Sequence, residues 1–251
     1  MLNFRHPYFL LFLTFAALWA AAQVGLFFRR RHHALDEDTE DFTFIVGATL
    51  TLLGLIVGFT FSMAVSRYDQ RKNLEEQEAN AIGTEYLRVD ILPPADAAKI
   101  RTILRAYLDR RILYYEARDK EAITELNAET AQLQNQLWAA AIAPAKAQPN
   151  PLTALAVAGM NDVLNSQGYA QAAWWNRIPA SAWILLVTMS IFCNLLIGYG
   201  VRLKSEPLFL ILPVVLSISL FLIADIDSPR RGVIHIRAQN LESLAESVKA
   251  Q

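Results

Sequence analysis

Residues 42–66 read FTFIVGATLTLLGLIVGFTFSMAVS and contain no Asp, Glu, Lys, Arg or His. A helix of roughly 20 apolar residues crosses the hydrocarbon core of a bilayer, because each residue adds about 1.5 Å. Residues 67–92, RYDQRKNLEEQEANAIGTEYLRVDIL, turn charged at once, and the next proline is Pro93. The sequence therefore predicts one long helix that leaves the membrane and continues into water.

Small residues recur along the apolar half of this stretch, at Gly47, Thr51, Gly54, Gly58 and Ser62. Their steps of four, three, four and four place them on one face of a helix. Such a face lets helices pack closely in lipid. It could equally line a narrow path along the axis of a ring of subunits. The spacing alone favours packing and leaves both interpretations open.

Composition indicates an integral membrane protein. Of the 251 residues, 54% are hydrophobic and 19% are charged, and the charges fall in blocks between apolar runs. The net charge of −1 gives no basic excess, and no nucleic-acid-binding motif is present, so nucleic acid is not expected as a partner. The single cysteine, Cys193, lies in an apolar run and can form no intrachain disulfide.

Three further apolar runs have spanning length, which gives four predicted transmembrane helices in total. They are residues 8–28, 180–201 and 207–224, the last with Pro213 as a point of kinking. The first run also has features of a cleaved signal peptide, since Arg5 precedes it and it contains small residues. It continues to Phe28 and stops at three arginines, which favours a retained anchor.

The charged region between the second and third spans is predicted to be an all-α insert. Pro93 and Pro94 break the long helix, because proline lacks an amide donor and disfavours helix in the residue before it. Apolar residues at three- and four-residue steps then predict further helices in 95–117, 120–143 and 152–178, with a loop at 144–151. The predicted division is 1–66 (spans one and two), 67–178 (insert), 179–227 (spans three and four) and 228–251 (tail).

The distribution of basic residues predicts which side of the membrane holds the insert. Four spans place both termini and the insert on one side. That side carries Arg5, Arg67, Arg71, Lys72, Arg177, Arg230, Arg231 and Arg237 near span ends, and the other carries Arg29, Arg30, Arg31, Arg202 and Lys204. Positive charge is retained in the cytoplasm, so eight against five favours cytoplasmic termini and insert.

No constellation of residues points to catalysis or to a cofactor. The four histidines are scattered, and adjacent His32 and His33 make a poor metal pair. Nucleophile-elbow, phosphate-loop and zinc-protease motifs are absent from the sequence. We therefore predict no catalytic residue, no metal site and no cofactor.

Charged residues gather instead where the predicted spans end. They are Arg67, Asp69, Arg71, Glu85, Arg177, Asp225, Asp227, Arg230 and Arg231. The charges within residues 67–72 fit two interpretations. They form either a collar that stops transfer through the membrane, with helix pairs such as Arg71–Glu75, or a charged vestibule. For Asp225, a partner among the nearby arginines is expected, because a carboxylate at a bilayer edge is costly unless paired or hydrated. Two local carboxylates are too few for a hard cation, which favours an ion pair over a metal site.

Several segments resemble a family of bacterial membrane proteins called bestrophin-like. They are LLGLIVGFTFSMAVSRYDQRK (52–72), EANAIGTEYLRVDILP (78–93), Asn161, WNRIP (175–179) and DIDSPRRGVI (225–234). The resemblance extends over nearly all of residues 42–236 and is specific to that family. A more distant resemblance links the family to bestrophins proper, which are pentameric anion channels with four spans and cytoplasmic termini.

The resemblance implies an oligomeric channel, most simply a pentamer, in the bacterial inner membrane. It implies a pore lined by the second span and its cytoplasmic continuation, with Thr51, Gly54, Gly58, Phe61 and Ser62 near the pore. Phe59 or Phe61 would form an apolar constriction, which can gate by dewetting. Animal bestrophins hold calcium with a run of acids after the fourth span, whereas this chain has Asp225 and Asp227 followed by two arginines.

The sequence thus predicts an all-α integral membrane protein that conducts small inorganic ions, with anions implied by the resemblance. Membrane lipid and further copies of the chain are its expected partners. Two other classes remain open: a non-conducting scaffold or sensor whose insert binds a cytoplasmic partner, and a membrane enzyme acting through Asp225 and Asp227. A channel requires the small-residue face to border water, whereas a scaffold requires that face to be buried and dry.

Overall fold

The computed structural model describes residues 7–31, 39–200, 208–230 and 232–250, and these form helices joined by turns, with no strand. The predicted all-α class is confirmed for this part of the chain. The chain divides into two compact units: unit 1 is Met1–Ser66 with Arg177–Ile234, and unit 2 is Arg67–Asn176 with His235–Gln251. Arg5, the His32–His33 pair, the turn at 202–206 and Arg231 lie outside the described residues.

The predicted long helix is present as α2 (Thr39–Arg88), 50 residues without interruption. It contributes residues up to Ser66 to unit 1 and residues from Arg67 to unit 2. A short 3-10 turn, η1 (Val89–Ile91), follows it, and Leu92 is extended. This ending agrees with the constraint that a proline places on the residue before it.

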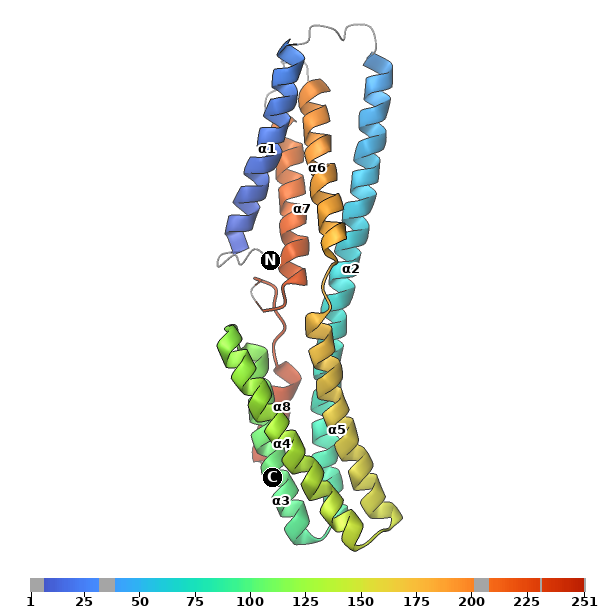
Figure 1. Ribbon diagram of the computed structural model, residues 1–251, viewed down its shortest axis with the longest axis vertical. Coiled ribbons are helices and arrows are strands. Elements are labelled where there is room, and N and C mark those ends of the chain that lie inside the picture. The colour runs from blue at the N-terminus through green and yellow to red at the C-terminus, as the bar shows by residue number, and fades with distance from the viewer. Residues whose placement is uncertain (1–6, 32–38, 201–207, 231, 251) are drawn as a thin grey trace. The chain divides into compact units, whose positions relative to one another are not determined.

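Unit 1 also contains α1 (Pro7–Arg31), α6 (Ala180–Gly200), the 3-10 turn η2 (Leu208–Leu210) and α7 (Ile211–Asp227). Figure 1 shows α1, α6 and α7 side by side. Together with α2 they form an apolar core that comprises Leu18, Leu53, Leu186, Cys193, Leu216 and Leu220.

The closest helix contact in unit 1 joins α1 to α6 through two glycines. A Cβ placed on Gly25 would overlap the carbonyl oxygen of Leu195, and one placed on Gly198 would overlap that of Ala22. Small residues allow this approach of backbones, which supplies dispersion contacts where lipid removes the hydrophobic driving force. Close packing through small residues therefore occurs at α1 and α6.

Within the part of the chain that the structure describes, three helical stretches are long and apolar enough to cross a membrane: Tyr8–Arg31, Glu40–Ile91 and Pro151–Gly200. The third contains both α5 and α6, and α6 is its part without Asp, Glu, Lys, Arg or His. The run predicted as the fourth span forms α7, which has 17 residues. Pro213 is the third residue of α7 and so lies in its first turn. An amide there has no partner within the helix, so Pro213 removes no internal hydrogen bond of α7.

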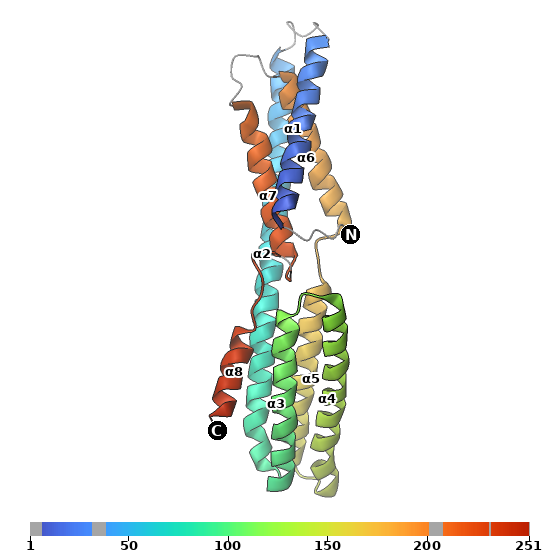
Figure 2. The same cartoon turned by 90° about the vertical axis from the view of Figure 1, so that its left-hand side faces the viewer.

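Unit 2 packs the end of α2 with α3 (Pro94–Glu116), α4 (Lys120–Ala147), α5 (Pro151–Trp175) and α8 (Gln239–Lys249). Figure 2 shows these helices side by side. Their core includes Ile82, Ile100, Leu104, Tyr107, Leu137, Met160, Trp174 and Leu241.

The chain between α4 and α5 differs from the prediction. The helix α4 continues through Pro144 to Ala147, whereas a loop was expected from Pro144 onward. Pro144 is buried in the last turn of α4, where its missing amide removes a single helical hydrogen bond. Asn150 then caps α5, its side chain accepting hydrogen bonds from the amides of Leu152 and Thr153.

Candidate functional site

The small-residue face of α2 is open within unit 1. Thr51, Gly54, Gly58 and Ser62 are exposed, and a Cβ placed on Gly54 or Gly58 would meet nothing within 4 Å. The opposite face packs inward, with Leu53 1% exposed. Packing against helices of the same unit is therefore not the use of this face. It is available to another copy of the chain, to lipid or to water.

Two phenylalanines near this face differ in direction. Phe59 is 71% exposed and Phe61 is 40% exposed. Because each residue turns a helix by about 100°, Phe61 shares a face with Gly54, seven residues earlier, whereas Phe59 points well to one side. Of the two candidates for an apolar constriction, Phe61 lies closer to the small-residue face.

In unit 2 the exposed face of α2 carries a row of uncharged polar residues over three turns. Asn73, Gln77, Asn80 and Thr84 are exposed at steps of four, three and four. Glu76 and Lys72 flank this row and are also exposed. The amides and hydroxyl offer both donors and acceptors to whatever lies beside them.

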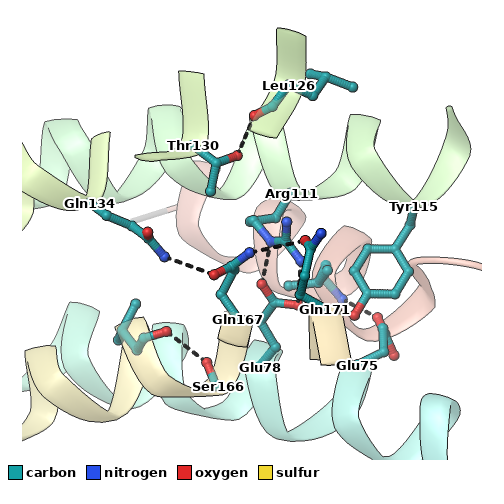
Figure 3. Close-up of polar contacts among 12 residues, drawn as sticks. Glu75, Glu78, Arg111, Tyr115, Leu126, Thr130, Gln134, Ser166, Gln167 and Gln171 are labelled. Carbon is teal, nitrogen blue, oxygen red and sulfur yellow. Dashed lines mark hydrogen bonds and ion pairs between the residues drawn. The ribbon is translucent and has the colours of Figure 1, made fainter. Parts of the chain in front are cut away.

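Several acids of the same helix point the other way, into the bundle. Glu78 is fully buried against Arg111 of α3, whose Nη2 donates to Glu78 Oε2 at 3.2 Å and whose Nε donates to Oε1. Tyr115 donates from its hydroxyl to the same Glu78 oxygen at 3.0 Å, as Figure 3 shows. Burial alone lowers the pKa of Arg111, but the Glu78 carboxylate raises it by more, so the guanidinium stays charged. Burial, followed by the neighbouring Glu78 charge, raises the pKa of the Tyr115 phenol.

A row of glutamines crosses unit 2 beside this ion pair (Figure 3). Gln134 of α4 donates to Gln167 of α5 at 3.2 Å, and Gln167 donates to Gln171 at 3.3 Å. Polar groups that satisfy one another inside a bundle fix one helix register over another, because a shifted register would leave them unpaired.

Arg71 and Glu75 act as caps for other helices. Arg71 is buried, and it donates to the carbonyls of Ala173 at 3.0 Å and Asn176 at 2.8 Å, at the end of α5. A cation there complements the partial negative charge of a helix C-terminus. Glu75 accepts from the amides of Asn240 and Leu241 at 2.9 and 3.0 Å, and from the Asn240 side chain at 2.6 Å, at the start of α8.

Glu85, the remaining predicted charge on the buried side of α2, lies between Arg88 and Gly159 of α5. Its side chain is 1% exposed, and its Oε2 is 3.4 Å from Arg88 Nη1. Asp69 is exposed, and Arg67 is half-buried. Of the predicted α2 charges, Arg71 and Glu85 are thus buried in the bundle, whereas Asp69 faces outward.

In unit 1 the two aspartates at the end of α7 bind backbone amides. The carboxylate of Asp225 accepts from Val233 at 2.7 Å and from Ile234 at 2.8 Å, and that of Asp227 accepts from Ile178 at 3.0 Å. Both aspartates are buried, which such charge-assisted bonds make tolerable. Arg177 is exposed, and Arg230 is half-buried. Among the described residues, no three His, Cys, Asp or Glu side chains gather as a metal site requires.

Sequence reasoning gave no role to Arg111 or to the glutamine row. Arg111 carries a usable signal, because it follows Tyr107 and Leu108 at steps of four and three on the apolar face of α3. A charge on an apolar face requires a buried partner. The identity of that partner depends on which helix packs opposite.

Comparisons with known proteins agree with this architecture. The bestrophin-like domain matches residues 14–241. A variant of a bacterial bestrophin homologue from Klebsiella pneumoniae has a similar fold, with a TM-score of 0.71 at 13% identity over 95% of this chain and 97% of that one. Another variant of that homologue gives 0.68 at 14% identity over 97% and 98%.

A structure described as a membrane protein variant gives a TM-score of 0.70 at 13% identity over 96% of this chain and 97% of that one. At these identities the likeness establishes the fold alone. No curated protein matches the chain. The domain match covers most of the sequence and confirms the predicted resemblance, so the chain belongs to the bestrophin-like family.

Proposed function

We propose that the chain is the subunit of an oligomeric membrane ion channel whose pore is lined by α2. The observation that carries the proposal is the open face of Thr51, Gly54, Gly58 and Ser62, opposite a buried face of the same helix. Small side chains leave room along the axis of a ring of helices. Membership of the bestrophin-like family supports that use of the face.

In this proposal the pore wall continues along the exposed polar face of α2 in unit 2. Ser62 and Asn73 are eleven residues apart, which is close to three turns of a helix, so helical periodicity joins the two faces. Asn73, Gln77, Asn80 and Thr84 can replace part of an ion's hydration without a fixed charge. Such a wall suits passage of small hydrated ions.

Phe61 is the proposed constriction. Its ring lies next to the small-residue face by helical spacing and is large enough to narrow a path that Gly58 leaves wide. A ring of phenylalanines from several copies would form a dry segment, which ions cross only when it widens or wets. Phe59, two residues earlier, serves as the matched control because it is more exposed and lies off that face.

We propose that four helices cross the membrane, with α7 as the fourth. Its 17 residues and the preceding three-residue η2 together reach about 30 Å, which is the thickness of the hydrocarbon core. The positive-inside rule then places the termini and the insert, residues 67–178, in the cytoplasm of a bacterial cell. We propose a pentamer in the inner membrane, by similarity to bestrophins.

Anion conduction rests on the same similarity, and two exposed acids of α2, Asp69 and Glu76, oppose it locally, because they lie seven residues apart on one face. Asp69 is exposed and lies seven residues after Ser62, so two helical turns bring its carboxylate to the proposed wall. A ring of carboxylates attracts cations and repels anions. The exposed Lys72, three residues further on, offsets this charge.

The test is recording from purified full-length protein in planar bilayers under a chloride gradient. Unitary currents that reverse toward the chloride equilibrium potential are expected. Phe61→Ala should raise the unitary conductance more than Phe59→Ala, and Asp69→Asn should move the reversal potential further toward that of chloride. Electrical silence of a folded oligomer would contradict the channel and favour the non-conducting scaffold or sensor.

A further inference from the structure

The contact between α2 and α5 in unit 2 contains a carboxylate that is only half satisfied. Glu85 is 0% exposed, and its Oε1 has no hydrogen-bond partner among the described residues. Its Oε2 faces Arg88 Nη1 at 3.4 Å, a long contact for a charge-assisted hydrogen bond. An ionised carboxylate normally collects several donors when it is buried, and this one has a single distant partner.

The space for this group is provided by a glycine. A Cβ placed on Gly159 of α5 would overlap both Arg88 Nη1 and Glu85 Oε2. The two side chains therefore lie directly on the backbone of α5, where any larger residue would displace them. Ala156 and Met160, beside Gly159 on α5, are 0% exposed, so the surroundings are apolar.

The charges around Glu85 do not stabilise its ionised form fully. From α2 the facing charge is Arg88, and from α5 it is the like-charged Asp162. Asp90 of η1 is instead paired with Arg101 of α3. Burial, as the largest cause, raises the pKa of Glu85 to about 7, which Arg88 partly opposes and Asp162 reinforces.

We propose that Glu85 is a proton-binding site that governs the packing of α5 on α2. The neutral acid fits the dry space over Gly159. Loss of the proton leaves a buried anion with one distant cation, which is relieved when α5 loosens and admits water. The proposal concerns the packing of unit 2 and does not require that the protein conduct ions.

Proton linkage sets the direction in which pH shifts the packing of α5 on α2, and the pH range of that shift. In the packed state Glu85 holds its proton up to about pH 7, whereas in the loosened, hydrated state its pKa falls toward the ordinary 4.5. Between these values the loosened state has lost a proton that the packed state retains, so rising pH favours loosening. The packing equilibrium shifts by about tenfold per pH unit in this window and is flat above it.

The experiment combines infrared titration with hydrogen exchange on the full-length protein in detergent, from pH 5 to pH 8. Wild-type protein should show a protonated-carboxyl band that titrates near neutrality, and Glu85→Gln should lack it. After correction for intrinsic rates, the protection of α5 amides around Gly159 should fall about tenfold per pH unit between pH 5 and pH 7 in wild type. It should be constant in Glu85→Gln.

Glu76→Gln is the matched control, because Glu76 is an exposed acid on the same helix. It should leave both the infrared band and the exchange profile of wild type unchanged. Infrared titrations of wild type and Glu85→Gln that superimpose would overturn the proposal. So would equal pH dependence of α5 exchange in the two proteins.

Discussion

The guanidinium of Arg111 lies against the carboxylate of Glu78 with both side chains 0% exposed, and this pair ties α3 to α2 inside unit 2. Tyr115 completes the arrangement with its hydrogen bond to Glu78, and the centre of the Tyr114 ring lies 4.4 Å from the Arg111 guanidinium carbon. A buried charge is tolerated only with such partners, so each member of the pair depends on the other.

Replacing Arg111 with alanine should therefore lower the free energy of unfolding far more than replacing its neighbour Arg110. Arg111→Ala leaves Glu78 buried and unpaired, and should lower the free energy of unfolding by about 3–5 kcal/mol. Arg110→Ala breaks a pair with Glu129 whose side chains are 43% and 38% exposed, and should cost about 1 kcal/mol or less. Denaturant titration in detergent, followed by tryptophan fluorescence, measures both. Similar losses in the two variants would contradict the role of the buried pair.

Alanine substitutions at two glycines of α5 should have opposite effects on the stability of the protein. Gly159→Ala places a methyl group on Arg88 and Glu85 and should lower the thermal unfolding midpoint by several degrees. Gly168→Ala meets nothing within 4 Å and should stabilise the helix by up to about 1 kcal/mol, because alanine is the better helix former. Differential scanning fluorimetry of the two variants decides the point. A midpoint for Gly159→Ala at or above wild type would show that the space over Gly159 is not filled.

The docking of α8 should depend on Glu75. Glu75→Ala removes the acceptor for the Asn240 and Leu241 amides at the start of α8. We expect faster hydrogen exchange throughout α8, because a lost helix cap costs about 1 kcal/mol. Glu76→Ala changes an exposed neighbour and should leave the exchange of α8 as in wild type. Unchanged protection of α8 in Glu75→Ala would exclude this anchoring.

Local sequence patterns predicted the all-α class and the long helix well. Residues 42–92 combine an uncharged run with a sudden change to charge, and Pro93 follows directly; each of these signals acts over a few turns. The extension of α4 through Pro144 was missed, because one lost hydrogen bond in a last turn is offset by burial against the rest of unit 2.

The partners of the buried charges could not be predicted in the same way. Spacing along α2 suggested that Arg71 pairs with Glu75, four residues later, yet Arg71 caps α5 and Glu75 caps α8. Glu78 meets Arg111, 33 residues away in the chain. Contacts of this kind depend on which helices pack together, and helical periodicity carries no information about that choice.

The exposed face of α2 is proposed to border the ion path, and cysteine accessibility tests this most directly. In a Cys193→Ser background, Ser62→Cys places a thiol on that face, and Met63→Cys places one on a neighbouring exposed position off it. A water-soluble thiol reagent should reduce the unitary current through Ser62→Cys and leave that through Met63→Cys unchanged. Full labelling of Ser62→Cys with no change in current would contradict the claim.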